Sequence, residues 1–183
     1  MKLFCYPWSG GSSALFFKYS KILGNDITII PSDVDCSKGT AFLEVIQNSA
    51  EKIVQQVQEN EKFILFGHSM GAVIAYEINK ALNGKIDLKN VGLVISGMLP
   101  PSRDMFEKLD SELTCEKAKN YSSELGMDNL DKLPDTFLDA VVNKMNADNK
   151  FLKGYESCDD IKLEGPSAVI YSEQELALGH PSA

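Results

Sequence analysis

Ser69 is the residue of this 183-residue chain best placed for chemistry, because it stands in the stretch Gly67-His68-Ser69-Met70-Gly71, between an apolar run and a helix-compatible segment. A serine at a tight turn between a strand and a helix projects its hydroxyl clear of the sheet. A helix that begins just after the serine also aims free backbone N–H groups at a reacting oxyanion. The three fixed residues alone match by chance in roughly one chain in twenty of this length, so the interpretation depends on the flanking strand and helix. The stretch predicts a nucleophilic serine.

A second glycine-bearing loop, Pro7-Trp8-Ser9-Gly10-Gly11, follows the apolar residues 1–6. Ser12 and Ser13 can cap a helix after this loop. The apolar residues beyond them recur at helical spacing up to Gly24, namely Leu15, Phe16, Tyr19, Ile22 and Leu23. Glycine lets a backbone approach a substrate closely, so the loop can supply a second N–H to an oxyanion. A tight turn with no further role is the alternative.

The predicted elements alternate between strands and helices. Strands are expected at residues 1–6, 26–30, 62–67 and 91–96. The second helix begins after Thr40, a predicted N-cap. The third begins at Met70, continues through the glycine-free residues 72–82 and ends at Asn83-Gly84. The second has an apolar face formed by Leu43, Ile46, Ala50, Ile53, Val54 and Val57. Because the strands are continuously apolar rather than alternating, we expect a parallel sheet buried on both faces. The fold class is therefore α/β, with a single domain over residues 1–183.

The pattern changes between residue 103 and about residue 155, where no strand is expected and the chain is charged and helical. Leu133-Pro134-Asp135 predicts the start of a helix whose apolar face is Phe137, Leu138, Val141, Val142 and Met145. A helical insertion after a sheet strand can act as a lid that excludes water, or can be a packed subdomain without motion. Strand character returns at residues 167–171.

The composition excludes several classes of function. The net charge of −8, with no basic cluster, argues against a nucleic-acid surface. The widely spaced Cys5, Cys36, Cys115 and Cys158 form no Cys-x-x-Cys pair, so we expect reduced, buried thiols and neither a metal site nor another cofactor. The loop after residue 6 interrupts any signal peptide, and no apolar stretch reaches the roughly 20 residues of a membrane span. We expect a cytoplasmic protein that does not bind membranes.

Three stretches of the chain resemble the type II thioesterases that accompany polyketide and nonribosomal peptide synthetases. Residues 3–12 are similar to that family's strand and oxyanion loop, and Phe66-Gly67-His68-Ser69-Met70-Gly71-Ala72 is similar to its elbow. The third stretch is similar to the end of the family's lid and its acid-bearing strand: Leu133-Pro134, Asn146-Ala147-Asp148, Phe151-Leu152, Tyr155 and residues 166–175. The resemblance implies an α/β-hydrolase fold with a helical lid at about residues 103–155.

The resemblance also assigns roles to residues near the two glycine-bearing turns. Ser69 takes the place of the nucleophile. The backbone N–H of Met70, together with one from Trp8 or Ser9, takes the place of the oxyanion hole. Both donors are backbone groups, so the assignment depends on the shape of the turns rather than on particular side chains.

The acid and the base of such a triad follow the nucleophile in the order Ser, Asp or Glu, His. Glu175 falls where the family has its aspartate, just past a strand, and Glu173 is the fallback. Of the two histidines, His68 lies in the turn itself and is interpreted as structural, whereas His180 follows Glu175 in the required order. The resemblance places the family's histidine after a further helix and strand. The alternative to His180 is therefore a shortened chain whose last strand and helix, with the catalytic histidine, lie beyond residue 183.

The function implied by the resemblance is that of a serine thioesterase. It hydrolyses acyl or aminoacyl thioesters on the phosphopantetheine arm of carrier-protein domains, without a cofactor of its own and as a monomer. Two alternatives remain at this point. A general hydrolase of small esters shares the elbow, and a catalytically silent relative retains acyl and carrier binding alone. A preference for carrier-bound substrates tests the first alternative, and labelling of Ser69 by a fluorophosphonate tests the second.

Overall fold

The computed structural model describes residues 1–36, 39–101, 103–124, 134–157 and 162–171. Within these residues, five strands form one sheet of order β2-β1-β3-β4-β5, and every neighbouring pair is parallel. The strands are β1 (Lys2–Tyr6), β2 (Thr28–Pro31), β3 (Phe63–His68), β4 (Val91–Ser96) and β5 (Ser167–Ile170). The sheet confirms the predicted α/β class and places β3, the strand that leads to Ser69, in the middle.

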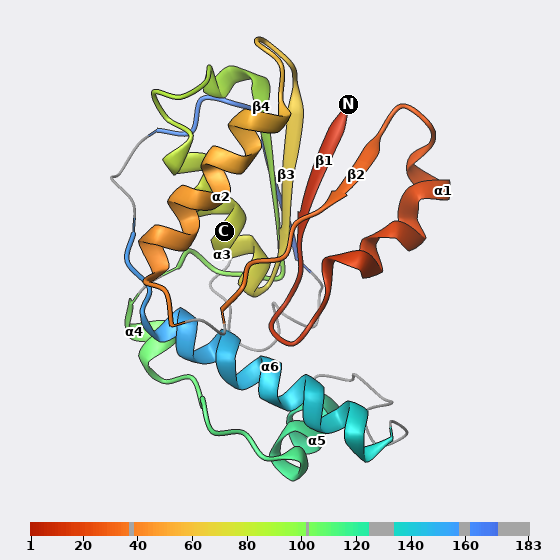
Figure 1. The fold of residues 1–183 in the computed structure, drawn as a ribbon, viewed down its shortest axis with the longest axis vertical. Helices are drawn as coiled ribbons and strands as arrows, with labels where there is room; N and C mark the ends of the chain where they lie inside the picture. The colour runs from red at the N-terminus through yellow and green to blue at the C-terminus, as the bar shows by residue number, and fades with distance from the viewer. Residues whose placement is uncertain (37–38, 102, 125–133, 158–161, 172–183) are drawn as a thin grey trace.

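Helices cover both faces of this sheet (Figure 1). On one face lie α2 (Phe42–Gln56) and α3 (Met70–Ala81), and on the other lie the 3-10 helix η1 (Ser13–Tyr19) and the short α1 (Ser20–Leu23). A 3-10 turn, η2 (Leu88–Asn90), precedes β4.

A helical segment separates β4 from β5, as the sequence predicts. Among the described residues of this segment, the helices are α4 (Arg103–Glu107), α5 (Cys115–Glu124) and α6 (Asp135–Lys153). In Figure 1 these helices gather at the lower end of the molecule, beyond the carboxyl ends of β1 and β3. The segment therefore lies at the end of the sheet where the turn with Ser69 emerges.

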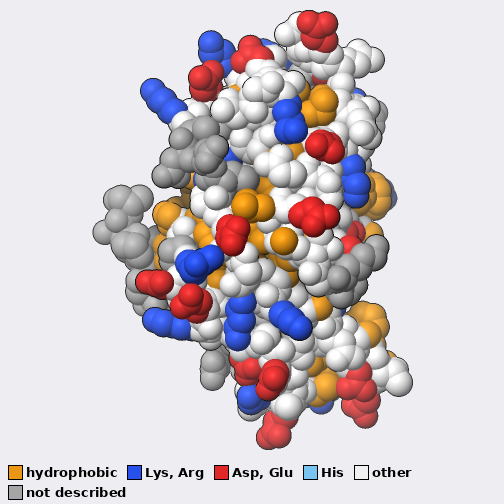
Figure 2. Space-filling view, turned by 60° about the vertical axis from the view of Figure 1, so that its left-hand side comes forward, with side chains coloured by type: hydrophobic (Ala, Val, Ile, Leu, Met, Phe, Trp, Pro, Cys, Tyr) orange, Lys and Arg blue, Asp and Glu red, His pale blue; other side chains and the backbone are white. Residues whose placement is uncertain are grey.

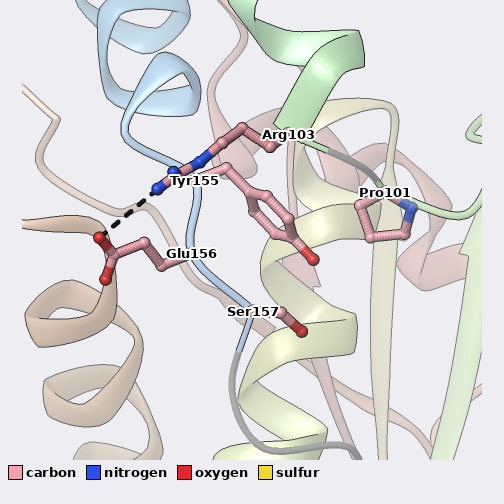
Figure 3. A pocket seen from close by; sticks show the side chains of 5 residues that line it. All are labelled: Pro101, Arg103, Tyr155, Glu156 and Ser157. Carbon is pink, nitrogen blue, oxygen red and sulfur yellow. Dashed lines mark ion pairs between the residues drawn. The ribbon is translucent and has the colours of Figure 1, made fainter.

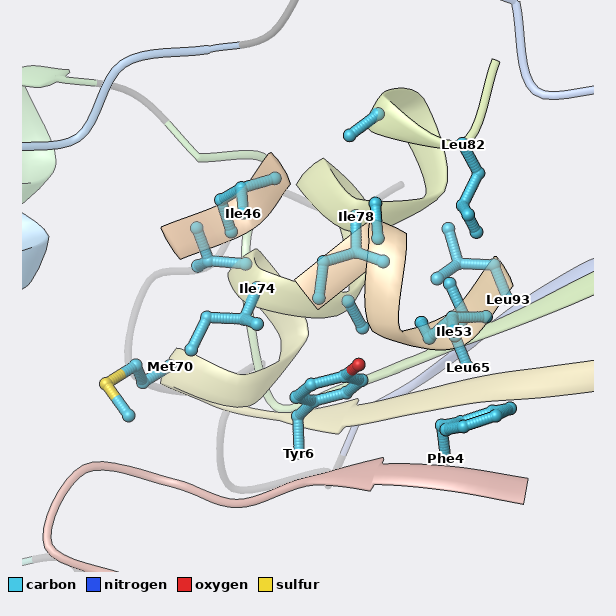
Figure 4. Close-up of a cluster of buried hydrophobic side chains, with 14 of the residues drawn as sticks. Phe4, Tyr6, Ile46, Ile53, Leu65, Met70, Ile74, Ile78, Leu82 and Leu93 are labelled. Carbon is cyan, nitrogen blue, oxygen red and sulfur yellow. The ribbon is translucent and has the colours of Figure 1, made fainter. Parts of the chain in front are cut away.

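The largest hydrophobic core lies between the sheet and the pair α2 and α3 (Figure 4). The sheet contributes Phe4, Tyr6, Leu65 and Leu93, and the helices contribute Ile46, Ile53, Met70, Ile74 and Ile78. Burying each large apolar side chain stabilises the fold by about 1.5–3 kcal/mol. Every residue of α3 except Tyr76 is buried. The helix behind Ser69 is thus held along its whole length.

The segment after the first loop differs from the prediction. Residues 13–19 form a 3-10 helix rather than an α-helix, and among the apolar residues expected on one face only Phe16 is buried, while Ile22 is 80% exposed. A 3-10 helix has three residues per turn, so side chains spaced for an α-helix spread around it. The capping prediction was correct at Ser12, whose hydroxyl accepts the Ala14 N–H.

The start of α2 also differs from the prediction. The helix begins at Phe42 with Ala41 as its N-cap, so Thr40 does not cap it. The buried Phe42 ring packs against the rings of Phe151 and Tyr155, with centroids 4.9 and 5.2 Å away. The first residue of α2 is therefore held by aromatic packing and not by a side-chain cap.

The apolar face predicted for α6 is only partly buried. Leu138 and Val142 are buried against Ala118 of α5, whereas Phe137 is 56% exposed. The helix begins at Asp135 with Pro134 before it, as the sequence predicts.

The described residues can be compared with the expectations from composition for charge, membrane spans, metal sites and thiols. Figure 2 shows acidic and basic side chains interspersed over one face, with hydrophobic side chains between them. No helix among the described residues is long and apolar enough to cross a bilayer. Within the same residues, no three His, Cys, Asp or Glu side chains are grouped to hold a metal. Cys5, Cys36 and Cys115 are free thiols, but only Cys5 is buried, so the expectation of uniformly buried cysteines was wrong.

Candidate active site

Ser69 occupies the turn between β3 and α3 in a conformation that few residues other than glycine adopt. Its φ is 54° and its ψ is −120°. Such a conformation costs of the order of 1–3 kcal/mol and persists only where the surroundings hold it. Two backbone hydrogen bonds of 2.9 Å do so: the Ser69 N–H donates to the Ser96 carbonyl, and the Ser69 carbonyl accepts the Ala72 N–H. The strained turn expected from the sequence is present.

Both glycines of the motif are required by close backbone approach. A Cβ on Gly67 would overlap the Gly71 carbonyl, and a Cβ on Gly71 would overlap the Tyr6 carbonyl and lie 2.7 Å from the Pro7 oxygen. Close-packed interiors leave no room for such overlaps. Gly67 therefore lets α3 start directly against β3, and Gly71 lets α3 pack against the end of β1.

His68 has partners that give it a structural role. Its Nδ1 lies 3.1 Å from the Ser96 hydroxyl, and its ring meets the Trp8 ring edge-on, with centroids 6.0 Å apart. Ser96 thus bonds both residues of the turn, through its hydroxyl to His68 and through its carbonyl to Ser69. The end of β4 holds the turn in place.

The loop after β1 turns back on itself beside the start of α3. The Gly11 N–H donates to the Trp8 carbonyl at 2.9 Å, and Gly10 has a φ of 77°, which favours glycine. The approach of Gly71 to the carbonyls of residues 6 and 7 brings the loop next to the first turn of α3. Apart from the Ala72 N–H, which bonds the Ser69 carbonyl, the backbone N–H groups at the start of a helix have no partner within the helix. Two possible sources of oxyanion donors therefore adjoin one another.

The predicted nucleophile Ser69 and the predicted donor Met70 are adjacent in the turn. The loop with Trp8 and Ser9 reaches this turn through the contact of the Trp8 ring with His68 and of the Pro7 carbonyl with Gly71. The predicted acid and base lie outside the described residues: Glu175, its fallback Glu173, and His180.

Two contacts of the loop were not predicted from the sequence. The Gly10 N–H donates to Asp148 Oδ2 at 2.8 Å, and the Ser9 hydroxyl donates to Asn149 Oδ1 at 3.1 Å. Both acceptors lie near the end of α6, and both are buried. Two adjacent buried polar residues on a helix indicate that hydrogen-bond partners lie opposite them, because buried polar groups need partners.

A buried polar cluster joins the nucleophile helix to the segment that follows α6. The Tyr155 hydroxyl donates to Glu77 Oε1 at 2.8 Å, Lys80 Nζ lies 3.4 Å from Glu77 Oε2, and Lys80 also donates to the Ser157 hydroxyl at 2.6 Å. Burial, followed by the hydrogen bond to Glu77, raises the pKa of Tyr155 well above its usual range. The phenol therefore remains a neutral donor at physiological pH.

Replacing Tyr155 by phenylalanine is expected to lower the free energy of unfolding by about 2 kcal/mol, because the buried Glu77 carboxylate loses a donor. Urea unfolding measures the change. Tyr19→Phe is the matched control: Tyr19 is 42% exposed, so its variant should stay within about 0.5 kcal/mol of the wild type. Equal changes in the two variants would contradict this description of the cluster.

Two adjoining cavities open beside this cluster. One, of about 430 Å³, is lined by Pro101, Arg103, Tyr155, Glu156 and Ser157. Figure 3 shows Arg103 paired with Glu156, at 3.7 Å, while the hydroxyls of Tyr155 and Ser157 point away from this pair. The other, of about 330 Å³, is mostly apolar and lies between α3, β4, β5 and residues 98–101. Together the cavities form a space with an apolar part and a polar rim along α3, the helix that follows Ser69.

The fold and this site define a class of protein: residues 1–177 match the model of the Thioesterase domain, and the chain belongs to that family. It is similar to "Thioesterase PikA5" of Streptomyces venezuelae, with 25% identity over 96% of this chain and 64% of PikA5. It is also similar to "Gramicidin S biosynthesis protein GrsT" of Aneurinibacillus migulanus, with 22% identity over the whole chain and 73% of GrsT. The chain thus spans about two thirds of the length of these relatives.

Solved structures show the same fold. The type II thioesterase BorB from the borrelidin biosynthetic cluster superposes with a TM-score of 0.73 at 17% identity, over 94% of this chain and 72% of BorB. RedJ, the thioesterase of the prodiginine pathway in Streptomyces coelicolor, superposes with a TM-score of 0.67 at 18% identity, over 94% of this chain and 80% of RedJ. The predicted α/β-hydrolase fold and the resemblance to type II thioesterases are confirmed.

Proposed function

We propose that this protein is a serine thioesterase that releases acyl or aminoacyl groups from the phosphopantetheine arm of carrier proteins. The observation that carries the proposal is the strained Ser69 beside the loop at residues 7–11, in a chain that belongs to the thioesterase family. Similarity to the gramicidin S biosynthesis protein GrsT, and to the type II thioesterase BorB of the borrelidin biosynthetic cluster, supports carrier-bound substrates.

In the proposed mechanism, Ser69 Oγ attacks the thioester carbonyl while a base accepts its proton. The tetrahedral oxyanion accepts hydrogen bonds from the Met70 N–H and from the N–H of Trp8 or Ser9, which lie on adjoining segments. The carbon–sulfur bond then breaks, the thiol leaves with the proton held by the base, and an acyl-Ser69 ester remains. Water, activated by the same base, hydrolyses the ester and restores Ser69. The reaction needs no cofactor.

The acid and the base of the proposal come from the sequence order. Glu175 and His180 follow Ser69 in the order that hydrolases use, so within residues 1–183 they are the candidates for the orienting carboxylate and the imidazole base. His68 is unsuited to the task, because its ring is held by Ser96 and Trp8.

A comparison of substrates tests the proposal. The kcat/KM for an acetyl or aminoacyl group on a carrier protein is expected to exceed that for p-nitrophenyl acetate by at least about tenfold, which corresponds to 1.4 kcal/mol of recognition by groups outside the reacting bond. The measurement follows acid release from both substrates at equal enzyme concentration. An equal or higher value for the free ester would identify a small-ester hydrolase instead.

A further inference from the structure

The helical segment holds the loop at residues 7–11 through a buried carboxylate. The Asp148 side chain is only 1% exposed, and its Oδ2 accepts both the Gly10 N–H, at 2.8 Å, and the Lys144 ammonium, at 3.0 Å. A buried charge is costly unless it is paired and hydrogen-bonded. The Cys36 thiol also hydrogen-bonds this side chain. These partners hold Asp148 in place.

Asp148 stands five residues before the end of α6 at Lys153, next to a second polar side chain that contacts the loop. Its neighbour Asn149 accepts the Ser9 hydroxyl at 3.1 Å and donates to the Asp110 carbonyl at 2.8 Å. Two consecutive side chains of α6 thus bind two consecutive residues of the loop.

The Asp148 contact fixes the central peptide group of a turn in the loop. The hydrogen bond from Gly11 to Trp8 closes a four-residue turn, and Gly10, with φ of 77°, stands at its third position, as a type II turn requires. Rotation of the central Ser9–Gly10 peptide group converts such a turn into type I and swings the Gly10 N–H away. Asp148 accepts that N–H, so it opposes the rotation.

Direct packing adds to this restraint. A Cβ on Gly10 would lie 2.5 Å from Met145 Cγ, so α6 presses on the loop one helical turn before Asp148. The loop is therefore enclosed between α6 on one side and, through residues 6 and 7, the start of α3 on the other.

We propose that Asp148 is a positioning residue that holds the Ser9–Gly10 peptide group, so that the loop N–H groups face the oxyanion only while α6 is docked. This inference rests on the proposed thioesterase function. In this proposal the helical segment contributes to the oxyanion hole indirectly, because it holds the loop that donates the hydrogen bonds and does not itself contact the substrate.

Three variants of the full chain test the inference. Asp148→Ala removes the acceptor, and Asp148→Asn keeps an oxygen acceptor. Asp139→Ala is a control on the exposed side of the same helix, where the carboxylate accepts the Cys115 thiol of α5 rather than a group of the loop. Asp148→Ala is expected to lower kcat for release from an acyl-carrier protein by about 10- to 100-fold with KM nearly unchanged. The reason is that oxyanion donors stabilise mainly the transition state, and a shift of about an ångström weakens that stabilisation. Asp148→Asn is expected to recover most of kcat, and Asp139→Ala to match the wild type.

Amide hydrogen exchange at Gly10 gives a second readout that does not depend on turnover. Exchange is expected to accelerate at least about tenfold in Asp148→Ala and to stay slow in Asp148→Asn, because the amide loses its acceptor only in the first variant. Unchanged exchange, or faster exchange with an unchanged kcat, would overturn the positioning role. A wild-type chain without turnover would instead contradict the proposed function, and the exchange data would still decide whether Asp148 holds the loop.

Discussion

Replacing Ser69 by alanine is expected to lower kcat for thioester release by roughly 10⁴-fold or more, the scale of loss on removing the nucleophile of a hydrolase triad. The backbone of this turn is held by Ser96 and Ala72 and not by the Ser69 hydroxyl, so the variant should fold like the wild type. The positive φ at position 69 is kept in both proteins, and alanine tolerates it about as poorly as serine. The loss should therefore lie in the chemistry and leave KM and thermal unfolding nearly unchanged.

A serine remote from the site provides the control for this prediction. Ser49 lies on α2, where its hydroxyl bonds only the Val45 carbonyl of the same helix among the contacts described. Ser49→Ala should match the wild type in kcat within about twofold. Release by Ser69→Ala at the wild-type rate would show that the acyl group leaves by a route that does not involve this serine.

Replacing Gly71 by alanine is expected to destabilise the fold by about 4 kcal/mol or more, at the upper end of the effects of single substitutions. The added Cβ would overlap the Tyr6 carbonyl and lie 2.7 Å from the Pro7 oxygen. These are backbone atoms of β1 and the loop, which cannot rotate away as a side chain can. Either α3 moves off the sheet or β1 loses its register with β3, and both outcomes disrupt the main core.

The control for this prediction is a glycine in the same sheet whose neighbours can move. A Cβ on Gly92 of β4 would lie 3.2 Å from Cγ1 of Ile64, a side-chain atom. Gly92→Ala should change the free energy of unfolding by less than about 1.5 kcal/mol, as tolerated core substitutions do. Urea unfolding of both variants measures the difference. A Gly71→Ala protein as stable as Gly92→Ala would contradict the close approach of α3 to β1.

The sequence predicted best the elements that are determined by a few neighbouring residues. The predominantly apolar runs at residues 63–68 and 91–96 are strands. A helix lies between them in the chain, and the two strands are parallel, because parallel neighbours need a long crossover connection that is usually a helix. The turn at Ser69 was predictable because its glycines and its strand–helix junction follow from a few adjacent residues. Strand order, which places β2 outside β1, carries no such local signal.

The errors arose where tertiary packing decides. At residues 13–19 the apolar spacing is that of an α-helix, yet the chain forms a 3-10 helix whose buried Phe16 packs against Phe66 and Trp8. The bond between Gly10 and Asp148 joins residues 138 positions apart, so no spacing rule could reveal it. The family resemblance covered both the loop at residues 7–11 and the end of α6, but the hydrogen bond that joins them is seen only in the structure.

Titration of Ser69 with a fluorophosphonate tests the central claim most directly, because the reagent modifies a serine only when its hydroxyl is activated. The protein is treated with increasing amounts of reagent, the modified residue is located by mass spectrometry, and residual release from an acyl-carrier protein is measured on the same samples. If Ser69 is the nucleophile of a thioesterase, residual release will fall linearly to zero at one phosphonyl group per chain, located on Ser69. An unmodified Ser69, or release that persists after Ser69 is fully modified, would contradict the account.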